Sequence, residues 1–418
     1  MRILYVAFDN PAVDTILGGM HDEELGGLPA FYFPFKFLLE RGHTVDLLLY
    51  IREEKTVVVS EHFKKENLIL VHPTKKGLAA SIELPFLLAR ETRKQIRAKK
   101  YDFVYGMTEG SHMAVRTAAW HGIPCALRQY GVQEMTAVLE RIPNRLMRYS
   151  KALKDYTYIT LSLLGEKSFL LTTNDGSRAN ELFGLLGIKK KRFKYFFWRS
   201  GVMITDKQPA IDADVNKTYP ETYDPLAISC VGRIADVKRQ DRCVRILKEL
   251  HQKGYPMHLY FVGDISSQNM YNETVAVARE SGIENFVHFE GGKSQKACRQ
   301  YARNAFATLL TAEWNRVNIF YEVMDEGALL LTNNNHSIDE FIEDGVNCLV
   351  YEEDDYAQAA DKLIALMNDE EKAKEIRTAA HHTAEERFMS LEKRFGMEVR
   401  LVEDAARGRD LSVYPETM

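Results

Sequence analysis

The sequence predicts an α/β protein with two doubly wound parallel-sheet domains, and three observations lead to this fold class. The chain has 418 residues, which is too long for one ordinary core and fits two domains of about 200 residues. In both halves, short apolar runs that fit buried parallel strands alternate with segments of helical period. Glycine and polar residues follow the apolar runs, as expected where the strands of such a sheet enter their loops.

The composition is that of a globular protein and argues against several classes of function. Hydrophobic residues make up 45% of the chain and aromatic residues 11%. A formal net charge of −4 argues against a general nucleic-acid binder. The five cysteines are scattered and form no CxxC pair, which favours free thiols in a reducing compartment. We find no membrane-spanning run and no signal-peptide pattern. We therefore expect a cytoplasmic protein, with peripheral contact at the inner face of a membrane left open.

The first half opens with a βαβ unit. Residues 2–8 and 45–50 are predicted strands, and residues 31–39 are a predicted helix between them. Gly26 and Gly27 lie in the polar loop at the carboxyl end of the first strand, where ligands bind in this architecture. A plain flexible turn is the alternative interpretation of these two glycines.

Further along the first half, two candidate contacts follow predicted strands. His112 begins a helix after the strand 101–106, and Tyr130 follows the strand 123–128. His112 could contact a substrate, although a histidine on a helix surface is the simpler interpretation. A helix over residues 82–100 has a basic second half, which we interpret as a solvated face. Residues 156–163 and 168–172 are predicted as later strands.

The domain boundaries are predicted from a change in composition. Basic and aromatic residues interleave over 189–201, which favours a strand or linker and leaves membrane-surface contact as the alternative. Residues 205–225 are polar and contain proline, as expected of a linker. The domains are therefore predicted at 1–204 and 205–390. Residues 391–418 should form a helix with a frayed tail, packing toward the first domain.

The stretch AEWNRVNIFYEVMDEGALLL, residues 312–331, carries the chemistry. Apolar residues recur at helical spacing after Asn318, Gly327 ends the helix, and the last four residues fit a central strand. Asn318 and Glu322 lie one helical turn, about 5.4 Å, apart. The free N–H groups at a helix start suit a phosphate. A carboxylate one turn deeper suits the hydroxyls of a ribose.

The second half reads as another doubly wound unit whose loops gather at one crevice. Its predicted strands are 226–231, 259–262, 286–290, 307–311, 328–331 and 348–351. Gly232, Arg233 and Lys238 follow the first of these strands, and Gly263 follows the second. Two fixed cations beside a helix start are well suited to a diphosphate. Taken alone, they would be ordinary surface residues.

Three segments together resemble glycosyltransferase family 4, the retaining nucleotide-sugar glycosyltransferases of the GT-B fold. They are VGRIADVK, FVGD and NRVNIFYEVMDEGALLLTNNNHSIDEFIEDGVNCLV. The resemblance is close over residues 228–387 and loose over residues 1–201, where ERGHTV, YDFVYG and HGIPCALRQYG carry it. It implies two Rossmann-like domains that face each other across a cleft. The first would bind the acceptor and the second the nucleotide-sugar.

The resemblance also implies roles for the candidate residues. Arg233 and Lys238 would be catalytic and grip the donor diphosphate, and Glu322 would bind the ribose. The donor side would be completed by the two loop glycines and the residues around the helix start: Gly26, Gly27, Gly232, Gly263, Asn315, Val317, Asn318 and Ile319. Because the two cations supply the positive charge, we expect no metal and no other cofactor.

The chain departs from the family pattern at several positions. The family has a glutamate eight residues before the one matched by Glu322, and Trp314 stands there. The neighbouring Glu313 is the carboxylate that could serve near the transferred sugar, as a third catalytic candidate. Asn315 and Val317 stand where the family has glycine and proline. On the acceptor side, where the family often has histidine, this chain has Tyr130, and His112 is the other acceptor-side candidate.

The leading hypothesis is a retaining glycosyltransferase of polysaccharide or glycoconjugate synthesis. It would move a sugar from a nucleotide-diphosphate donor, a UDP-sugar, to a saccharide, lipid-linked, protein or small-molecule acceptor. Trp314 and Tyr130 leave open a catalytically degenerate partner that binds an acceptor without turnover. A sugar-nucleotide epimerase is the third hypothesis, because that activity also occurs on this architecture.

Overall fold

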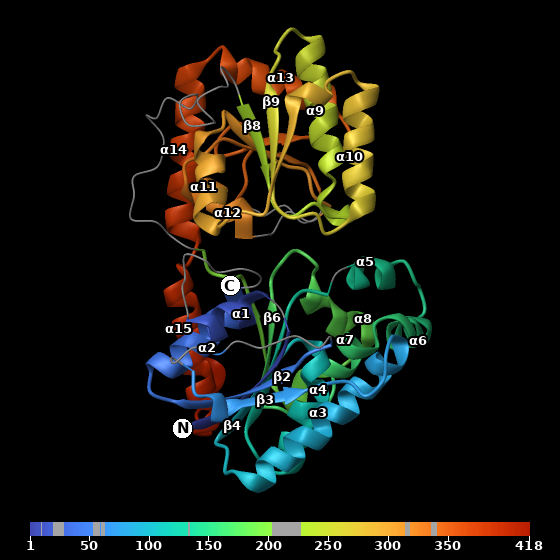
Figure 1. The fold of residues 1–418 in the computed structure, drawn as a ribbon, viewed down its shortest axis with the longest axis vertical. Coiled ribbons are helices and arrows are strands. Elements are labelled where there is room, and N and C mark those ends of the chain that lie inside the picture. The colour runs from blue at the N-terminus through green and yellow to red at the C-terminus, as the bar shows by residue number, and fades with distance from the viewer. Residues whose placement is uncertain are drawn as a thin grey trace. The chain divides into compact units, whose positions relative to one another are not determined.

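The computed structural model describes most of the chain as two compact units, each with its own parallel sheet (Figure 1). It describes residues 1–9, 11–19, 29–52, 59, 63–132, 134–202, 227–313, 318–335 and 341–418, with the backbone alone at 11, 29, 191 and 318. Unit 1 comprises residues 1–200 and 391–418, and unit 2 comprises residues 201–390. The boundary predicted at residues 204–205 lies outside the described residues and stays a prediction.

Unit 1 is built on a seven-stranded sheet with the order β3-β2-β1-β4-β5-β6-β7. The strands are β1 Arg2–Phe8, β2 Thr44–Tyr50, β3 Leu68–Val71, β4 Phe103–Met107, β5 Cys125–Gln129, β6 Phe169–Thr173 and β7 Lys194–Trp198. All of these pairs are parallel. Strand order reverses between β1 and β4. The central strands are buried on both faces, which explains their unbroken apolar runs.

Helices cover both faces of the unit 1 sheet. They are α1 Pro11–Gly18, α2 Pro29–Glu40, α3 Leu78–Ala98, α4 His112–Trp120, α5 Met135–Glu140, α6 Arg145–Asp155, α7 Thr157–Ser162, α8 Leu182–Leu186 and α15 Leu391–Ala406. Helices α3, α4 and α6 to α8 share one core with Leu4 and Val6 of β1. On the other face, Phe33 of α2 stacks on Phe395 of α15 with ring centroids 5.6 Å apart.

Two predictions of secondary structure in unit 1 are wrong. Residues 156–163, predicted as a strand, contain α7, because Ile159 and Leu163 are buried at helical spacing and this packing overrides strand propensity. The tail is also paired rather than frayed. The backbone N–H of Phe197 donates to the carbonyl of Glu416 at 2.7 Å, and that of Arg199 donates to the carbonyl of Met418 at 2.9 Å. The tail therefore covers the free edge of β7.

The basic and aromatic segment at residues 189–201 contains β7, which confirms the strand interpretation. The aromatic side chains of Tyr195 to Trp198 are buried within unit 1. They are therefore unable to reach a membrane surface. Among the described residues, no helix is both long and apolar enough to cross a membrane.

Unit 2 has a six-stranded parallel sheet with the order β10-β9-β8-β11-β12-β13. The strands are β8 Ala227–Val231, β9 His258–Val262, β10 Val287–Gly291, β11 Ala307–Leu310, β12 Leu330–Asn333 and β13 Leu349–Tyr351. The helices are α9 Gln240–Gln252, α10 Gln268–Glu280, α11 Gln295–Asn304, α12 Asn318–Asp325, α13 Tyr356–Met367 and α14 Glu370–Arg387. The predicted fold class, α/β with two doubly wound parallel sheets, is confirmed.

A buried charge cluster fastens α15 to the unit 1 sheet. Glu398 is fully buried and forms ion pairs with Arg128 of β5 and, at 3.0 Å, with Arg394. The hydroxyl of Tyr105 donates to the same carboxylate at 2.6 Å. Burial, more than any other effect, lowers the pKa of Arg394 to about 10. Two cations are thus held in the core of unit 1 by one acid from the end of the chain.

We predict that Glu398→Gln destabilises the full chain by about 3–5 kcal/mol, because it leaves two buried cations without their counter-charge. Chemical unfolding followed by circular dichroism measures the loss. The matched control is Asp155→Asn, which breaks the exposed Lys151–Asp155 pair on α6 and should leave the midpoint nearly unchanged. If Glu398→Gln lost as little stability as Asp155→Asn, the buried charge cluster would not be what stabilises unit 1.

Candidate active site

The carboxyl edge of the unit 2 sheet holds most of the residues predicted for donor binding. Strand order reverses between β8 and β11, and in such sheets a crevice opens where the two loops diverge. The loop after β8 carries Gly232, Arg233 and Lys238, and the loop after β11 carries Glu313. The structure therefore places residues about 80 positions apart in sequence on the two sides of one reversal point.

The loop after β8 packs directly on the end of β9. The backbone N–H of Gly232 donates to the carbonyl of Val262 at 2.8 Å. A Cβ on Gly263 would lie only 2.3 Å from the Gly232 carbonyl oxygen, and Gly263 has a φ of +156°. Glycine is needed at position 263 so that the two backbones can approach this closely. This is a structural requirement of the site and is not by itself evidence of ligand contact.

Lys238 and Arg233 form a small positive region in the loop after β8. Lys238 ends the 3₁₀ turn Asp236–Lys238 and is partly buried. Burial is the main cause that lowers its pKa to about 8, and the neighbouring Arg233 lowers it further. Among the described residues, neither cation takes part in an ion pair. Such a pair of cations favours an anionic ligand.

Hydrogen bonds hold this loop in place and join it to the loop after β11. The Gln240 side chain donates to the carbonyl of Arg233 at 3.0 Å. The Thr311 hydroxyl donates to the carbonyl of Arg239 at 2.9 Å, and the Glu313 N–H donates to the carbonyl of Val237 at 3.0 Å. The two sides of the crevice thus share a backbone contact.

Glu322 lies on α12 as predicted and is only 6% exposed. Its Oε1 accepts a hydrogen bond from Nε2 of Gln295 at 2.7 Å. Burial raises the pKa of the Glu322 carboxyl, and the charge of Arg299 partly offsets this. Burial, followed by the charges of Glu322 and Asp264, raises the pKa of the Cys298 thiol to about 11.

A network of charges fixes α12 against α11. Arg299 forms ion pairs with Asp325 and, at 2.5 Å, with Glu326, and Arg303 pairs with Glu326 as well. Asp325 is the last residue of α12 and Glu326 follows it directly, and both acids occupy the guanidinium of Arg299. Glu322 is consequently held in position while its only described hydrogen-bond partner is an amide.

Several predicted donor residues lie outside the described structure. Asn318 and Ile319 begin α12, as predicted. Gly26, Gly27, Trp314, Asn315 and Val317 fall on residues that the structure does not describe. Whether Glu313 or Trp314 fills the first glutamate position of the family pattern thus stays open.

The two acceptor-side candidates are packed into unit 1. His112 is buried at the start of α4, where its Nδ1 lies 2.9 Å from the carbonyl oxygen of Glu109, so the surface-histidine interpretation is wrong. Burial lowers the pKa of His112. Tyr130 stacks on Phe31 at 5.3 Å, and the Arg128 guanidinium lies 5.5 Å from its ring. The roles proposed for His112 and Tyr130 stay predictions.

Glu109 is a candidate that sequence reasoning missed. It follows β4, which lies beside β1 at the reversal point of the unit 1 sheet. The side chain is partly buried, and burial raises its pKa. No ion pair forms to it from the described residues. The preceding Thr108 has a φ of +65°, which is strained for a β-branched residue. The polar residues after β4 are visible in the sequence, but the sequence does not show that β4 lies beside β1 in the sheet.

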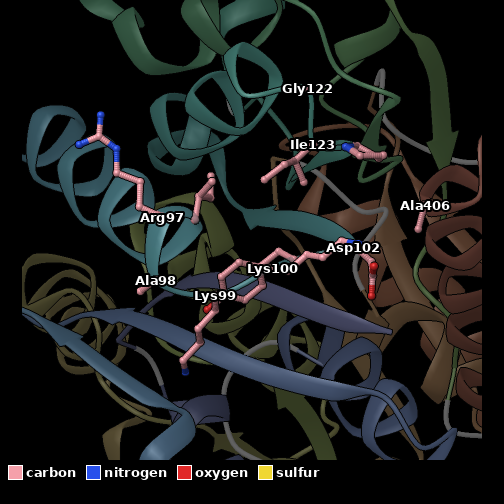
Figure 2. A pocket seen from close by; sticks show the side chains of 11 residues that line it. Arg97, Ala98, Lys99, Lys100, Asp102, Gly122, Ile123 and Ala406 are labelled. Carbon is pink, nitrogen blue, oxygen red and sulfur yellow. The ribbon is translucent and has the colours of Figure 1, made fainter.

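A cavity of about 610 Å³ opens at the opposite, amino edge of the unit 1 sheet (Figure 2). It is lined by residues 96–102 and 122–124 and by Ala406. Figure 2 shows the Lys100 side chain extending toward Asp102, whereas Arg97 extends away from both. Lys99 pairs with Asp46 at 3.2 Å, and Asp102 accepts the Arg2 N–H at 2.7 Å. Since all residues that line this cavity belong to unit 1 and lie at the amino edge of its sheet, it is not part of the candidate site.

Comparison with known proteins identifies the class. Residues 215–383 match the sequence model of the family described as Glycosyl transferases group 1. This region includes every loop of the unit 2 crevice. A search of curated proteins gives no match. Residues 215–383 therefore resemble a group 1 glycosyltransferase domain, and the enzyme class that this match supports is that of the glycosyltransferases.

Solved structures of similar fold cover nearly the whole chain. A glycosyltransferase from Rickettsia africae is 17% identical with a TM-score of 0.64, covering 97% of this chain and 98% of its own. HepE from Anabaena, in complex with UDP, is 14% identical with a TM-score of 0.64, covering 97% and 100%. Sucrose-phosphate synthase from Thermosynechococcus elongatus is 13% identical with a TM-score of 0.70, covering 98% and 100%. These likenesses establish the GT-B fold.

The tight approach at Gly263 generates a stability prediction. Gly263→Ala should lower the free energy of unfolding by about 1–3 kcal/mol, because the new methyl group is forced against backbone. Gly282→Ala is the control, since Gly282 also has positive φ but open space around its missing Cβ. Urea unfolding of both variants separates the cost of positive φ, which they share, from the clash with backbone, which only Gly263→Ala has. A smaller loss for Gly263→Ala than for Gly282→Ala would refute the packing argument.

Proposed function

We propose that this protein is a retaining glycosyltransferase of family 4 that transfers a sugar from a UDP-sugar to a hydroxyl group of an acceptor. The observation that carries the proposal is the cation pair of Arg233 and Lys238, placed with the buried Glu322 at the carboxyl edge of one sheet. Anabaena HepE structures hold UDP, UDP with glucose, or UDP-glucose. They support the choice of UDP as the nucleotide.

The donor is bound by complementary charges and hydrogen bonds. Arg233 and Lys238 contact the diphosphate, and the free N–H groups at the start of α12 point to the same anion. The carboxylate of Glu322 accepts hydrogen bonds from the ribose hydroxyls. Gln295 holds one oxygen of that carboxylate, so the other is oriented before the nucleotide arrives. Preorganisation of this kind reduces the entropy lost on binding.

The reaction breaks the bond between the sugar C1 and the diphosphate oxygen, and the electron pair stays on that oxygen. Negative charge grows there, so fixed cations and N–H groups stabilise the transition state more than the ground state. The acceptor oxygen forms the new bond on the face that the diphosphate leaves, which retains the configuration at C1. Its proton passes to the departing phosphate. Since Arg233 and Lys238 supply the positive charge, the proposal requires no metal ion.

We assign acceptor binding to unit 1, at the reversal point between β1 and β4. Glu109 is the best-placed group, because its partly buried carboxyl has no ion-pair partner among the described residues. A carboxylate there can accept a hydrogen bond from a sugar hydroxyl. The acceptor class that fits is a saccharide or glycoconjugate, handled in the cytoplasm.

A screen of nucleotide-sugars for slow donor hydrolysis tests the proposed function. The full chain should release UDP from one UDP-sugar, and Lys238→Ala or Glu322→Ala should lower that rate about a hundredfold, the usual loss when one transition-state donor is removed. The matched control is Lys248→Ala on α9, which lies outside the crevice. Circular dichroism confirms that each variant is folded.

The outcomes of this screen also separate the alternatives. Failure to bind any nucleotide by calorimetry would favour the non-catalytic partner. Conversion of one nucleotide-sugar into another without release of UDP would indicate an epimerase. Near-normal turnover in Lys238→Ala or Glu322→Ala would remove the site assignment.

The pKa of Lys238 predicts a pH dependence of UDP affinity. Only the protonated amine attracts the diphosphate, and in the free protein its pKa is about 8. Affinity should therefore be constant below pH 8 and fall by up to about tenfold per pH unit above it. Lys238→Arg keeps its charge at these pH values and should give a flat profile. Calorimetric titrations with UDP below and above pH 8 test both proteins. If the affinity of Lys238→Arg falls with pH as steeply as that of the parent protein, another group is responsible for the pH dependence.

A further inference from the structure

Helix α3 presents a stripe of large apolar side chains to solvent. Leu78, Ile82 and Phe86 are 78%, 62% and 68% exposed. They are spaced four residues apart, so they share one face of the helix. The opposite face is buried in the core of unit 1 through Leu84 and Leu88. Single exposed apolar residues are ordinary, but a contiguous stripe on one helix marks an interaction surface.

Cations continue this stripe along the same helix face. Arg90, Arg93 and Arg97 follow at helical spacing and are exposed. Between residues 75 and 100 the chain carries eight basic residues and two acidic ones, although the whole protein has a net charge of −4. Of the two acids, Glu83 accepts backbone N–H bonds from Thr74 and Lys75. The positive charge is therefore concentrated beside the apolar stripe.

Helix α6 adds a second surface of the same kind. Leu146 and Met147 are 79% and 62% exposed, and the helix carries four basic residues and one acidic residue. It packs with α7, whose Tyr158 hydroxyl bonds to the Ser81 carbonyl in the first turns of α3. Figure 1 shows α6 and α7 near this end of α3, on one side of unit 1. Helices α3 and α6 are thus linked through α7, and each exposes apolar side chains together with cations.

We propose that the exposed faces of α3 and α6 dock on an anionic lipid surface. A helix that lies in a membrane interface has this layout, with apolar side chains on one face and lysines or arginines beside them. The apolar stripe would enter the headgroup region, and the cations would contact lipid phosphates. The alternative interpretation of residues 189–201 was membrane contact, but the aromatic side chains of Tyr195 to Trp198 are buried. The docking surface instead belongs to two helices of unit 1.

This surface is distinct from the donor crevice, and its binding to lipid does not depend on sugar transfer. Its residues belong to unit 1, whereas the cations and Glu322 of the donor crevice belong to unit 2. Vesicle binding can therefore be measured without any nucleotide. UDP affinity, measured on the same samples, reports on the proposed function separately.

The test is co-sedimentation of the full chain with phosphatidylcholine vesicles, with and without phosphatidylglycerol. We expect binding only to the anionic vesicles, and weaker binding as salt is raised. Ile82→Ser/Phe86→Ser should reduce the bound fraction at least tenfold, because insertion strength scales with buried apolar area. The control is Val413→Ser, which changes an apolar residue that is 75% exposed elsewhere in unit 1.

A charge variant tests the second half of the proposal. Arg93→Gln should weaken binding to anionic vesicles about fivefold, the usual share of one cation near such a surface. Arg279→Gln removes an exposed arginine of unit 2 and should have no effect. Absence of binding by the parent protein, equal binding to neutral vesicles, or parent-like binding by the α3 variants would each overturn the proposal. The proposal would also be overturned if gel filtration showed a dimer that the α3 variants do not form and that anionic vesicles do not dissociate.

Discussion

The parallel pairing of β8 with β9 on one side and β11 on the other is the constraint on which the candidate active site depends. Because successive crossovers leave on opposite faces of the sheet, the loops after β8 and β11 diverge at one edge. The close backbone approach at Gly263 then fixes the loop after β8 against the end of β9. The positions of Arg233 and Lys238 therefore depend on the strand order and on the absence of a side chain at Gly263.

Two buried carboxylates, Glu398 in unit 1 and Glu322 in unit 2, differ in how fully their acceptor capacity is used. Glu398 is met by two arginines and a tyrosine hydroxyl, so its charge is satisfied within unit 1. Glu322 receives one described hydrogen bond, from Gln295. The nearby Arg299 is occupied by Asp325 and Glu326. A buried acid with unused acceptor capacity is suited to hold a ligand, whereas a fully matched one holds the fold.

The parts of the molecule that were predictable from the sequence are those decided by local pattern. The apolar runs gave the strands of unit 2, and Gly327 gave the end of α12, because strand burial and a glycine stop leave marks within a few residues. Glu322 and Lys238 could be named as candidates because their neighbours along the chain carry the pattern. The hydrogen-bond partner of Glu322 was not predictable, because Gln295 is 27 residues away along the chain. Glu109 was missed for the same reason: its importance depends on β1 lying beside β4.

Unit 1 is assembled from two stretches of chain that are separated by all of unit 2. Glu398 neutralises Arg128 across 270 residues, and the last residues cover the edge of β7. During translation, the amino-terminal stretch leaves the ribosome with a buried arginine unmatched and a sheet edge unprotected. Exposed edges of this kind promote aggregation. Unit 2 can thus complete its fold first, and unit 1 can complete its own only after residues 391–418 have been synthesised.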